Sequence, residues 1–192
     1  NDRLGEANAI VHIAQIDRLL SHSAEAKQSL VEARKKYKEV GNRSGEAEVL
    51  RELAEVLQIE RRSEEALEVL TEARNLYKAT GSRQGEANIL RAMGHYKSMI
   101  GHHDEAIGKY YEARNQFKSI GDRIGEGNSL IGLGTIEIVL ENYNEARLHF
   151  IEARDLLKAT GNRLGEANAI NNLGIAEAKL GNYSAARMDY DE

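Results

Sequence analysis

Residues 161–168 read GNRLGEAN, and near copies of this octet stand at residues 1–8, 41–48, 81–88 and 121–128. The copies are forty residues apart, and the chain of 192 residues aligns with itself at this period without an insertion. A fixed period of this length is typical of proteins built from one repeated supersecondary unit. The repeats run over residues 1–40, 41–80, 81–120, 121–160 and 161–192. The last repeat is truncated, and we expect all five to form a single array over 1–192.

Each repeat contains two stretches in which apolar residues return at helical spacing. In the fourth repeat, the first stretch holds Leu130, Leu133 and Ile136, and the second holds Phe150 and Leu157. This spacing places the apolar side chains on one face of a helix. We expect one helix over about positions 3 to 20 of each repeat and another over about positions 23 to 39. The absence of proline from the whole chain agrees with a structure that is helical almost throughout.

The turns carry residues that stop one helix and start the next. Glycine opens four repeats, at Gly41, Gly81, Gly121 and Gly161. Glycine adopts the left-handed conformation that ends a helix, and each of these glycines precedes Asn, Ser or Asp, which are favoured N-caps. Within repeats, the capping-box spacing occurs at Asn142 with Glu145, and in variant form at His22 with Glu25 and at His102 with Glu105.

Small residues recur where two helices must approach closely. In the first helix of each repeat they are Ala14, Ala54, Gly94, Gly134 and Gly174. A large side chain at this position would push the helices apart. Stacked helix pairs of this kind share a continuous core, so we expect an all-α solenoid.

The pattern within each repeat resembles the tetratricopeptide repeat. The match is clearest at Leu133, Gly134, Ala146, Phe150 and Ala153, and again at Leu173, Gly174, Ala186 and Tyr190. The period is longer than the usual length of about 34 residues, and this variety resembles the repeats of bacterial and fungal signalling ATPases and of animal spindle-orientation adaptors. The resemblance implies a right-handed α-solenoid of stacked antiparallel helix pairs. It also implies a scaffold or sensor role without chemistry of its own.

The composition excludes several classes of protein. Lys and Arg number 26 against 31 Asp and Glu, and the resulting net charge of −5 argues against a nucleic-acid partner. No stretch is apolar over the roughly 18 residues that a membrane span needs, and no basic-then-apolar leader is visible. We therefore expect no membrane partner and an intracellular, cytoplasmic location. The chain contains no cysteine, which excludes disulfides and thiolate zinc sites.

No cluster of residues predicts catalysis, a metal site or a cofactor. Glycine-rich positions fall inside predicted helices, where they cannot form a phosphate-binding loop. His102, His103 and Asp104, with His95 nearby in sequence, have metal-ligand chemistry but fall at a short turn, where polar residues are ordinary. We expect neither an enzyme nor a metalloprotein.

In solenoids of the family that the chain resembles, the first helix of each repeat lines the concave groove. Its polar positions are therefore the candidate binding surface. The eighth position holds Asn8, Glu48, Asn88, Asn128 and Asn168. A repeated amide can bind the backbone of an extended peptide through its donor and its acceptor. It can equally bond a neighbouring helix or its own backbone.

The remaining groove positions differ between repeats. The second repeat is acidic around one arginine, at Glu48, Arg51, Glu52 and Glu55, and the third presents Arg91 and His95. Such charge runs also occur on ordinary solvated surfaces. The fourth repeat instead presents Ile131, Thr135 and Ile138, on a helix that is apolar nearly all round, so either a ligand or closer packing of neighbouring helices covers it. The fifth repeat adds Asn171, Asn172 and Ile175.

Charged residues also flank each turn between repeats. We expect Arg34 to face Glu46 across the turn, as one rung of a ladder of exposed ion pairs worth about 0–1 kcal/mol each.

These patterns favour a protein-interaction module that holds a peptide or a helix of a partner protein in the groove. Two alternatives stay open. The array could be a ligand-sensing or regulatory arm of a larger signalling ATPase, or an architectural element that assembles through its ends. The apolar residues Leu173, Ile175, Leu180 and Tyr190 at the truncated end predict self-association end to end.

Overall fold

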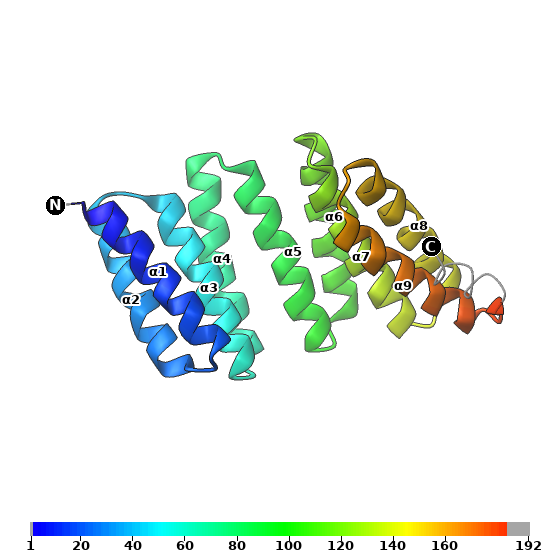
Figure 1. The fold of residues 1–192 in the computed structure, drawn as a ribbon, viewed down its shortest axis with the longest axis horizontal. Coiled ribbons are helices and arrows are strands. Elements are labelled where there is room, and N and C mark those ends of the chain that lie inside the picture. The colour runs from blue at the N-terminus through cyan, green and yellow to red at the C-terminus, as the bar shows by residue number, and fades with distance from the viewer. Residues whose placement is uncertain (1, 184–192) are drawn as a thin grey trace. The chain divides into compact units, whose positions relative to one another are not determined.

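The computed structural model describes residues 2–183, which form helices joined by short turns (Figure 1). In chain order the helices are α1 (Arg3–Leu19), α2 (Ser23–Glu39), α3 (Arg43–Ile59), α4 (Ser63–Thr80), α5 (Arg83–Met99), α6 (His103–Ser119), α7 (Arg123–Val139), α8 (Tyr143–Ala159) and α9 (Arg163–Lys179). The odd-numbered helices, here termed A helices, are the first helices of the repeats. All boundaries fall within one residue of the predicted ones, so the all-α prediction is confirmed.

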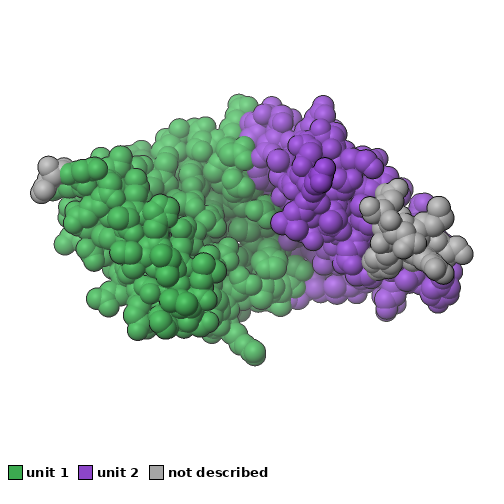
Figure 2. Space-filling model, viewed as in Figure 1, with its two compact units in different colours: residues 1–100 green, residues 101–192 purple. Residues whose placement is uncertain are grey.

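The chain divides into two compact units, residues 1–100 and 101–192 (Figure 2). The first unit holds α1 to α5, and the described part of the second holds α6 to α9. Within each unit, consecutive helices run antiparallel and pack on one another (Figure 1). The boundary falls inside the third repeat, and a single array over 1–192 stays a prediction. Residues 184–192, where most of the second helix of the fifth repeat is predicted, with Ala186 and Tyr190, lie outside the described residues.

The A helices begin as predicted. The side chains of Asp2, Asn42, Ser82, Asp122 and Asn162 each accept a hydrogen bond from the backbone N–H three residues later, at 2.8 to 3.2 Å. The glycines that open four of the repeats have φ between 69 and 75°. This left-handed conformation costs glycine little, so each glycine ends one helix directly before the cap of the next.

The predicted capping boxes within repeats are wrong. The N-caps of α2, α6 and α8 are His22, His102 and Asn142, and none of these side chains caps the helix backbone. Nδ2 of Asn142 instead donates to Oε2 of Glu137 at 2.8 Å. Nδ1 of His102 lies 3.4 Å from Oε1 of Glu105. In α6 and α8 these side chains interact with other side chains, and they accept no hydrogen bond from the backbone N–H groups of the first helical turn.

Rings from the second helices of the repeats pack on glycines of the A helices that follow. A Cβ atom added to Gly85 would lie 2.3 Å from the ring of Tyr77, and one added to Gly125 would lie 2.3 Å from Phe117. Only glycine therefore lets α4 meet α5, and α6 meet α7, at this distance. The predicted small residues are buried as well, and a Cβ on Gly134 would lie 2.6 Å from Phe150.

The predicted pair across the turn between repeats is confirmed. Nη2 of Arg34 lies 3.3 Å from Oε1 of Glu46. The same pairing recurs one repeat later between Arg74 and Glu86, at 3.0 Å, and in the second unit between Arg114 and Glu126, at 3.5 Å.

The expectation that this ladder is exposed is wrong at two of these rungs, although the pair of Arg3 and Glu39 is exposed. The residues Glu46 and Glu126 are each only 6% exposed. At the first rung, Lys38 also lies 3.4 Å from the Glu46 carboxylate, so two cations converge on it. A hydrogen-bonded ion pair in such a buried place contributes more than an exposed pair does.

Candidate functional site

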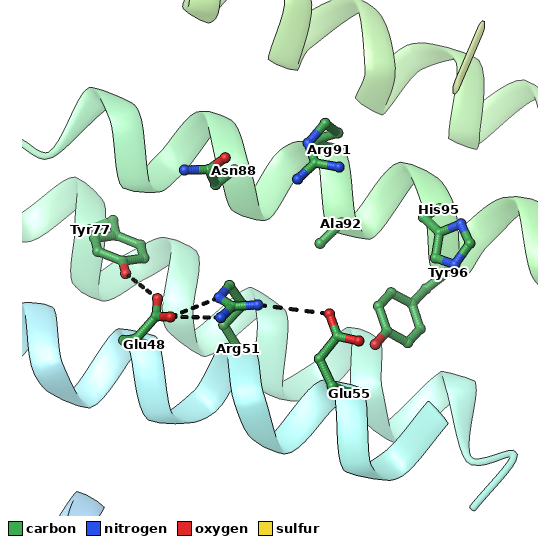
Figure 3. A pocket seen from close by; sticks show the side chains of 9 residues that line it. All are labelled: Glu48, Arg51, Glu55, Tyr77, Asn88, Arg91, Ala92, His95 and Tyr96. Carbon is green, nitrogen blue, oxygen red and sulfur yellow. Dashed lines mark hydrogen bonds and ion pairs between the residues drawn. The ribbon is translucent and has the colours of Figure 1, made fainter. Parts of the chain in front are cut away.

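A cavity of about 380 Å³ lies between α3 and α5 on the face of the first unit that the A helices form (Figure 3). We refer to it as the α3–α5 cavity. Its lining residues are Glu48, Arg51, Glu55, Tyr77, Asn88, Arg91, Ala92, His95 and Tyr96. The cavity thus brings together six of the residues predicted from the sequence: Glu48, Arg51, Glu55, Asn88, Arg91 and His95.

The repeat explains why these six side chains meet. Glu48, Arg51 and Glu55 stand at spacings of three and four residues and therefore share one face of α3. Asn88, Arg91 and His95 occupy the equivalent positions of α5, forty residues later. Figure 3 shows the two sets facing each other across the cavity. The same three helical positions thus carry two carboxylates and a guanidinium on α3, but an amide, a guanidinium and an imidazole on α5.

The α3 side of the cavity is an occupied ion-pair network. Nη2 of Arg51 lies 2.7 Å from Oε1 of Glu48, and Nη1 lies 3.7 Å from Oε1 of Glu55. Burial alone would lower the pKa of Arg51, but the hydrogen bond to Glu48 and the neighbouring carboxylates raise it above its ordinary value. Arg51 therefore stays protonated, and carboxylates of its own helix balance its positive charge.

Glu52 lies beneath this surface and is only 3% exposed. Its carboxylate accepts a hydrogen bond from Nε2 of Gln15 at 3.0 Å, lies 3.5 Å from Nε of Arg18 and contacts Arg51. These contacts join α1 to α3. Glu52 thus supports the candidate surface from below.

Two tyrosines that the sequence analysis did not single out complete the walls. The hydroxyl of Tyr77 donates to Oε2 of Glu48 at 3.2 Å, and that of Tyr96 donates to Oε1 of Gln58 at 3.3 Å. Burial raises the pKa of Tyr77 to about 12, helped by the charge of Glu48 and the hydrogen bond to it, and burial raises the pKa of Tyr96 as well. Both hydroxyls remain protonated donors. The sequence did contain a signal for these two residues, because a tyrosine at a core position needs a hydrogen-bond partner for its hydroxyl.

The α5 side offers donors that the described part of the chain does not use. Asn88 and Arg91 are half-buried, and neither side chain forms a hydrogen bond or ion pair with any of residues 2–183. His95 is exposed, with its ring edge-on to Tyr96 at 5.8 Å between centroids, and its Nε2 already lies 3.5 Å from Nε2 of Gln58. An arginine and an amide in this state can bind carbonyl or carboxylate oxygens.

The repeated asparagines do not all behave alike. Oδ1 of Asn8 accepts a hydrogen bond from the hydroxyl of Tyr37 at 2.6 Å, so this amide bonds a neighbouring helix. In the repeats of Asn88 and Asn128, the position of Tyr37 is held by Phe117 and Leu157. These residues have no hydroxyl, so they cannot donate the equivalent hydrogen bond.

In the fifth repeat, Asn168 and Asn171 are exposed. Nδ2 of Asn172 donates to the backbone oxygen of Asn168 at 2.8 Å, within α9. The amide of Asn172, which does not belong to the repeated asparagines, therefore bonds the backbone of its own helix.

The predicted apolar groove residues Ile131 and Ile138 of α7 are partly covered by neighbouring helices. Ile131 and Ile138 pack against the cluster of Ala146, Phe150, Leu173 and Ala176 in α8 and α9. The hydroxyl of Thr135 donates to the backbone oxygen of Ile131 at 2.8 Å. Ile175 is 37% exposed and stays available on the surface.

Two of the four apolar residues from which end-to-end association is predicted are buried or half-buried. Leu173 is buried, and Leu180 is half-buried. Tyr190 lies outside the described residues.

Within residues 2–183, no helix is both long and apolar enough to cross a membrane. The same span holds no group of three or more His, Asp or Glu side chains arranged to bind a metal ion.

Comparison with known proteins agrees with this architecture. The sequence pattern of the tetratricopeptide repeat matches residues 45–119 and 125–192, which is more than half of the chain. No curated protein matches the chain.

Several solved structures share the fold. BtubC from P. vanneervenii is 16% identical with a TM-score of 0.82, over 95% of this chain and 76% of BtubC. A signal-transduction ATPase of the STAND class with a tetratricopeptide repeat sensor, from Pyrococcus horikoshii, is 17% identical with a TM-score of 0.80, over 93% of this chain and 28% of the ATPase. A Rap protein complexed with Competence and Sporulation Factor is 18% identical with a TM-score of 0.82, over 97% of this chain and 52% of the Rap chain.

The identities are low, so these similarities speak for the fold alone. They agree with the stacked antiparallel helix pairs, and the predicted α-solenoid fold class is confirmed. The chain belongs to the tetratricopeptide-repeat family, whose fold is a scaffold for protein interactions.

Proposed function

We propose that this chain is a protein-interaction module and that the α3–α5 cavity binds a segment of a partner polypeptide. The observation that carries the proposal is the contrast between the two walls. On α3, Glu48 is already bonded to Arg51 and Tyr77. On α5, Asn88 and Arg91 keep their donors free of any partner within the described residues.

The free groups suit a polypeptide backbone. The amide of Asn88 can donate to one carbonyl and accept from one N–H of an extended chain, whatever its sequence. The fork of Arg91 can hold a second carbonyl or a carboxylate. The neutralised Glu48 and Arg51 pair and the two tyrosines form a wall that repels neither sign of charge strongly.

Peptides selected on the protein from a phage-displayed library of random dodecamers supply a defined probe. Their affinity is measured by calorimetry for the wild type, Arg91→Ala and Arg83→Ala. Arg83 is the matched control because it lies on the same helix, is exposed and does not line the cavity. We expect Arg91→Ala to weaken binding about tenfold and Arg83→Ala to leave it unchanged. Equal affinities for all three proteins would overturn the proposal.

A second candidate function is the sensor arm of a larger signalling ATPase. It is favoured by the similarity to the Pyrococcus horikoshii ATPase, in which the tetratricopeptide repeats are a sensor. The α3–α5 cavity would then bind the signal. The selected peptide should change the rate of ATP hydrolysis by the full-length parent protein, and an unchanged rate would leave only the interaction module.

A further inference from the structure

A second hollow, of about 700 Å³, lies where the A helices of the first unit end. The last turns of α1, α3 and α5 line it, together with the turn that follows α3. We refer to it as the turn-edge hollow. It shares only Glu55 with the α3–α5 cavity. Its properties therefore have to be explained separately from those of the cavity.

Exposed apolar side chains stand on both sides of this hollow. Ile59 at the end of α3 is 47% exposed, and Met99 at the end of α5 is 51% exposed. They occupy equivalent positions of successive repeats. Ile100 beside Met99 is half-buried. Large apolar groups gathered around a hollow lose unfavourable hydration when a partner covers them.

The turn after α3 holds an arginine in a left-handed conformation. Arg61 has φ of 59°, in the left-handed region. The equivalent positions of the other repeats are left-handed as well and hold Ser21, Gly101, Glu141 and Gly181. A residue with a side chain adopts this conformation less readily than glycine does. The left-handed conformation is therefore a property of this turn in the repeat, and Arg61 differs from Ser21 and Glu141 by its positive charge.

The charge of Arg61 is also unmatched. Its exposed side chain makes no hydrogen bond or ion pair with the part of the chain that the structure describes. The next residue, Arg62, lies 2.8 Å from Glu60 and 2.6 Å from Glu65. Glu60 and Glu65 are therefore already paired with Arg62.

The other charged groups around the hollow are balanced. Glu55 lies 3.7 Å from Arg51, and Arg18 lies 3.5 Å from Glu52. The hollow thus combines apolar side chains on two sides with one positive charge, that of Arg61, which has no partner in the described residues. This combination is complementary to an apolar side chain followed by a carboxylate.

We infer that the turn-edge hollow is a docking site for a polypeptide segment in which apolar and acidic residues alternate. An apolar side chain of the segment sits between Ile59 and Met99, and a neighbouring carboxylate pairs with Arg61. Successive side chains of an extended strand point to opposite sides about 3.3 Å apart, so one can enter the hollow while the next reaches its rim. The inference is independent of the α3–α5 cavity.

The probe is the blocked pentapeptide Leu-Asp-Leu-Asp-Leu, compared with Leu-Asn-Leu-Asn-Leu. Binding is read from the methyl signals of protein labelled with ¹³C at its methionine methyl groups. Met99 reports on the hollow, and Met93, which is buried on the same helix, is the internal control. We expect a saturable shift of the Met99 signal with the aspartate peptide, an unchanged Met93 signal, and affinity about fivefold lower for the asparagine peptide.

Arg61→Gly removes the guanidinium while keeping a residue that tolerates the left-handed turn, so it does not threaten folding. We expect it to weaken the aspartate peptide about fivefold and to abolish the difference between the two peptides. Glu141→Gly, the same change at a left-handed turn of the second unit, should have no effect on binding. Arg91→Ala should have none either, which separates this site from the cavity.

Two results would overturn the inference. One is a Met99 signal that does not move at millimolar aspartate peptide. The other is equal affinity of the wild type for the aspartate and asparagine peptides.

Discussion

The hydroxyl of Tyr77 donates a hydrogen bond to Oε2 of Glu48, 3.2 Å away, and so ties α4 to α3 at the wall of the α3–α5 cavity. The ring of the same tyrosine lies against the backbone of α5 at Gly85. Tyr37 makes the equivalent hydrogen bond to Asn8 at 2.6 Å. One residue of the second helix therefore fixes three helices around the candidate site.

Replacing Tyr77 by phenylalanine removes this hydrogen bond and leaves the ring in place. We expect Tyr77→Phe to lower the free energy of unfolding in urea by about 1 kcal/mol, because Glu48 keeps Arg51 as a partner. Tyr183→Phe is the control, since Tyr183 is 72% exposed. Equal loss in both variants would mean that the hydroxyl of Tyr77 contributes nothing specific.

The tyrosines also predict how stability depends on alkaline pH. Burial, helped by the charge of Glu48, raises the pKa of Tyr77 from its ordinary 10.0 to about 12, and burial raises the pKa of Tyr37 and Tyr96 too. A raised pKa means that the folded protein holds the proton more tightly than the unfolded chain. This contribution is complete below pH 10 and is lost as the pH rises towards 12.

The free energy of unfolding should therefore fall between about pH 10 and pH 12. Tyr77→Phe should make this fall shallower when urea unfolding is followed over the same range. A fall of the same steepness in the variant would show that Tyr77 does not take part in it.

The contact between Gly85 and Tyr77 predicts the effect of a single added methyl group. A Cβ at position 85 would lie 2.3 Å from the ring, so Gly85→Ala should destabilise the protein by roughly 1–3 kcal/mol. Gly108→Ala is the matched control, because a Cβ on Gly108 of α6 meets nothing within 4 Å. That substitution should stabilise its helix by up to about 1 kcal/mol. Thermal unfolding of the two variants should therefore shift in opposite directions.

The ion pairs between repeats should differ in strength according to burial. Glu46 is nearly enclosed between Arg34 and Lys38, so Glu46→Gln should cost about 1–3 kcal/mol in chemical unfolding. Glu39 forms an exposed pair with Arg3 at 3.5 Å, so Glu39→Gln should cost less than about 0.5 kcal/mol. Comparable losses would mean that burial does not set the strength of these pairs.

The period of the sequence sufficed to predict the helices and the caps of the A helices. The hydrogen bond from the backbone of Gly45 to the side chain of Asn42, for instance, joins residues three positions apart, so the local sequence is enough to predict it. The failed capping box at Asn142 shows the limit. Its amide donates to Glu137 of the preceding helix, and a choice between two acceptors depends on the geometry of the turn.

The sequence predicted which positions form the candidate site, but not which of their side chains lack a hydrogen-bond or ion-pair partner. Glu52 and Arg91 belong to neighbouring repeats and look equally available in the sequence. In the structure Glu52 is buried among donors from two helices, whereas Arg91 has no acceptor in residues 2–183. The turn-edge hollow was not predicted because it forms where the ends of three helices meet, which the sequence of one repeat does not show.

The central claim is that the unused donors of α5 bind a partner polypeptide, and the side-chain amide signals of asparagine test it most directly. A library-selected peptide is added to ¹⁵N-labelled protein while these signals are recorded. The account predicts that the Asn88 amide shifts in step with binding, while the Asn182 amide, which donates to Glu177 at 2.7 Å, stays in place. Saturable binding that leaves the Asn88 amide unmoved would contradict it.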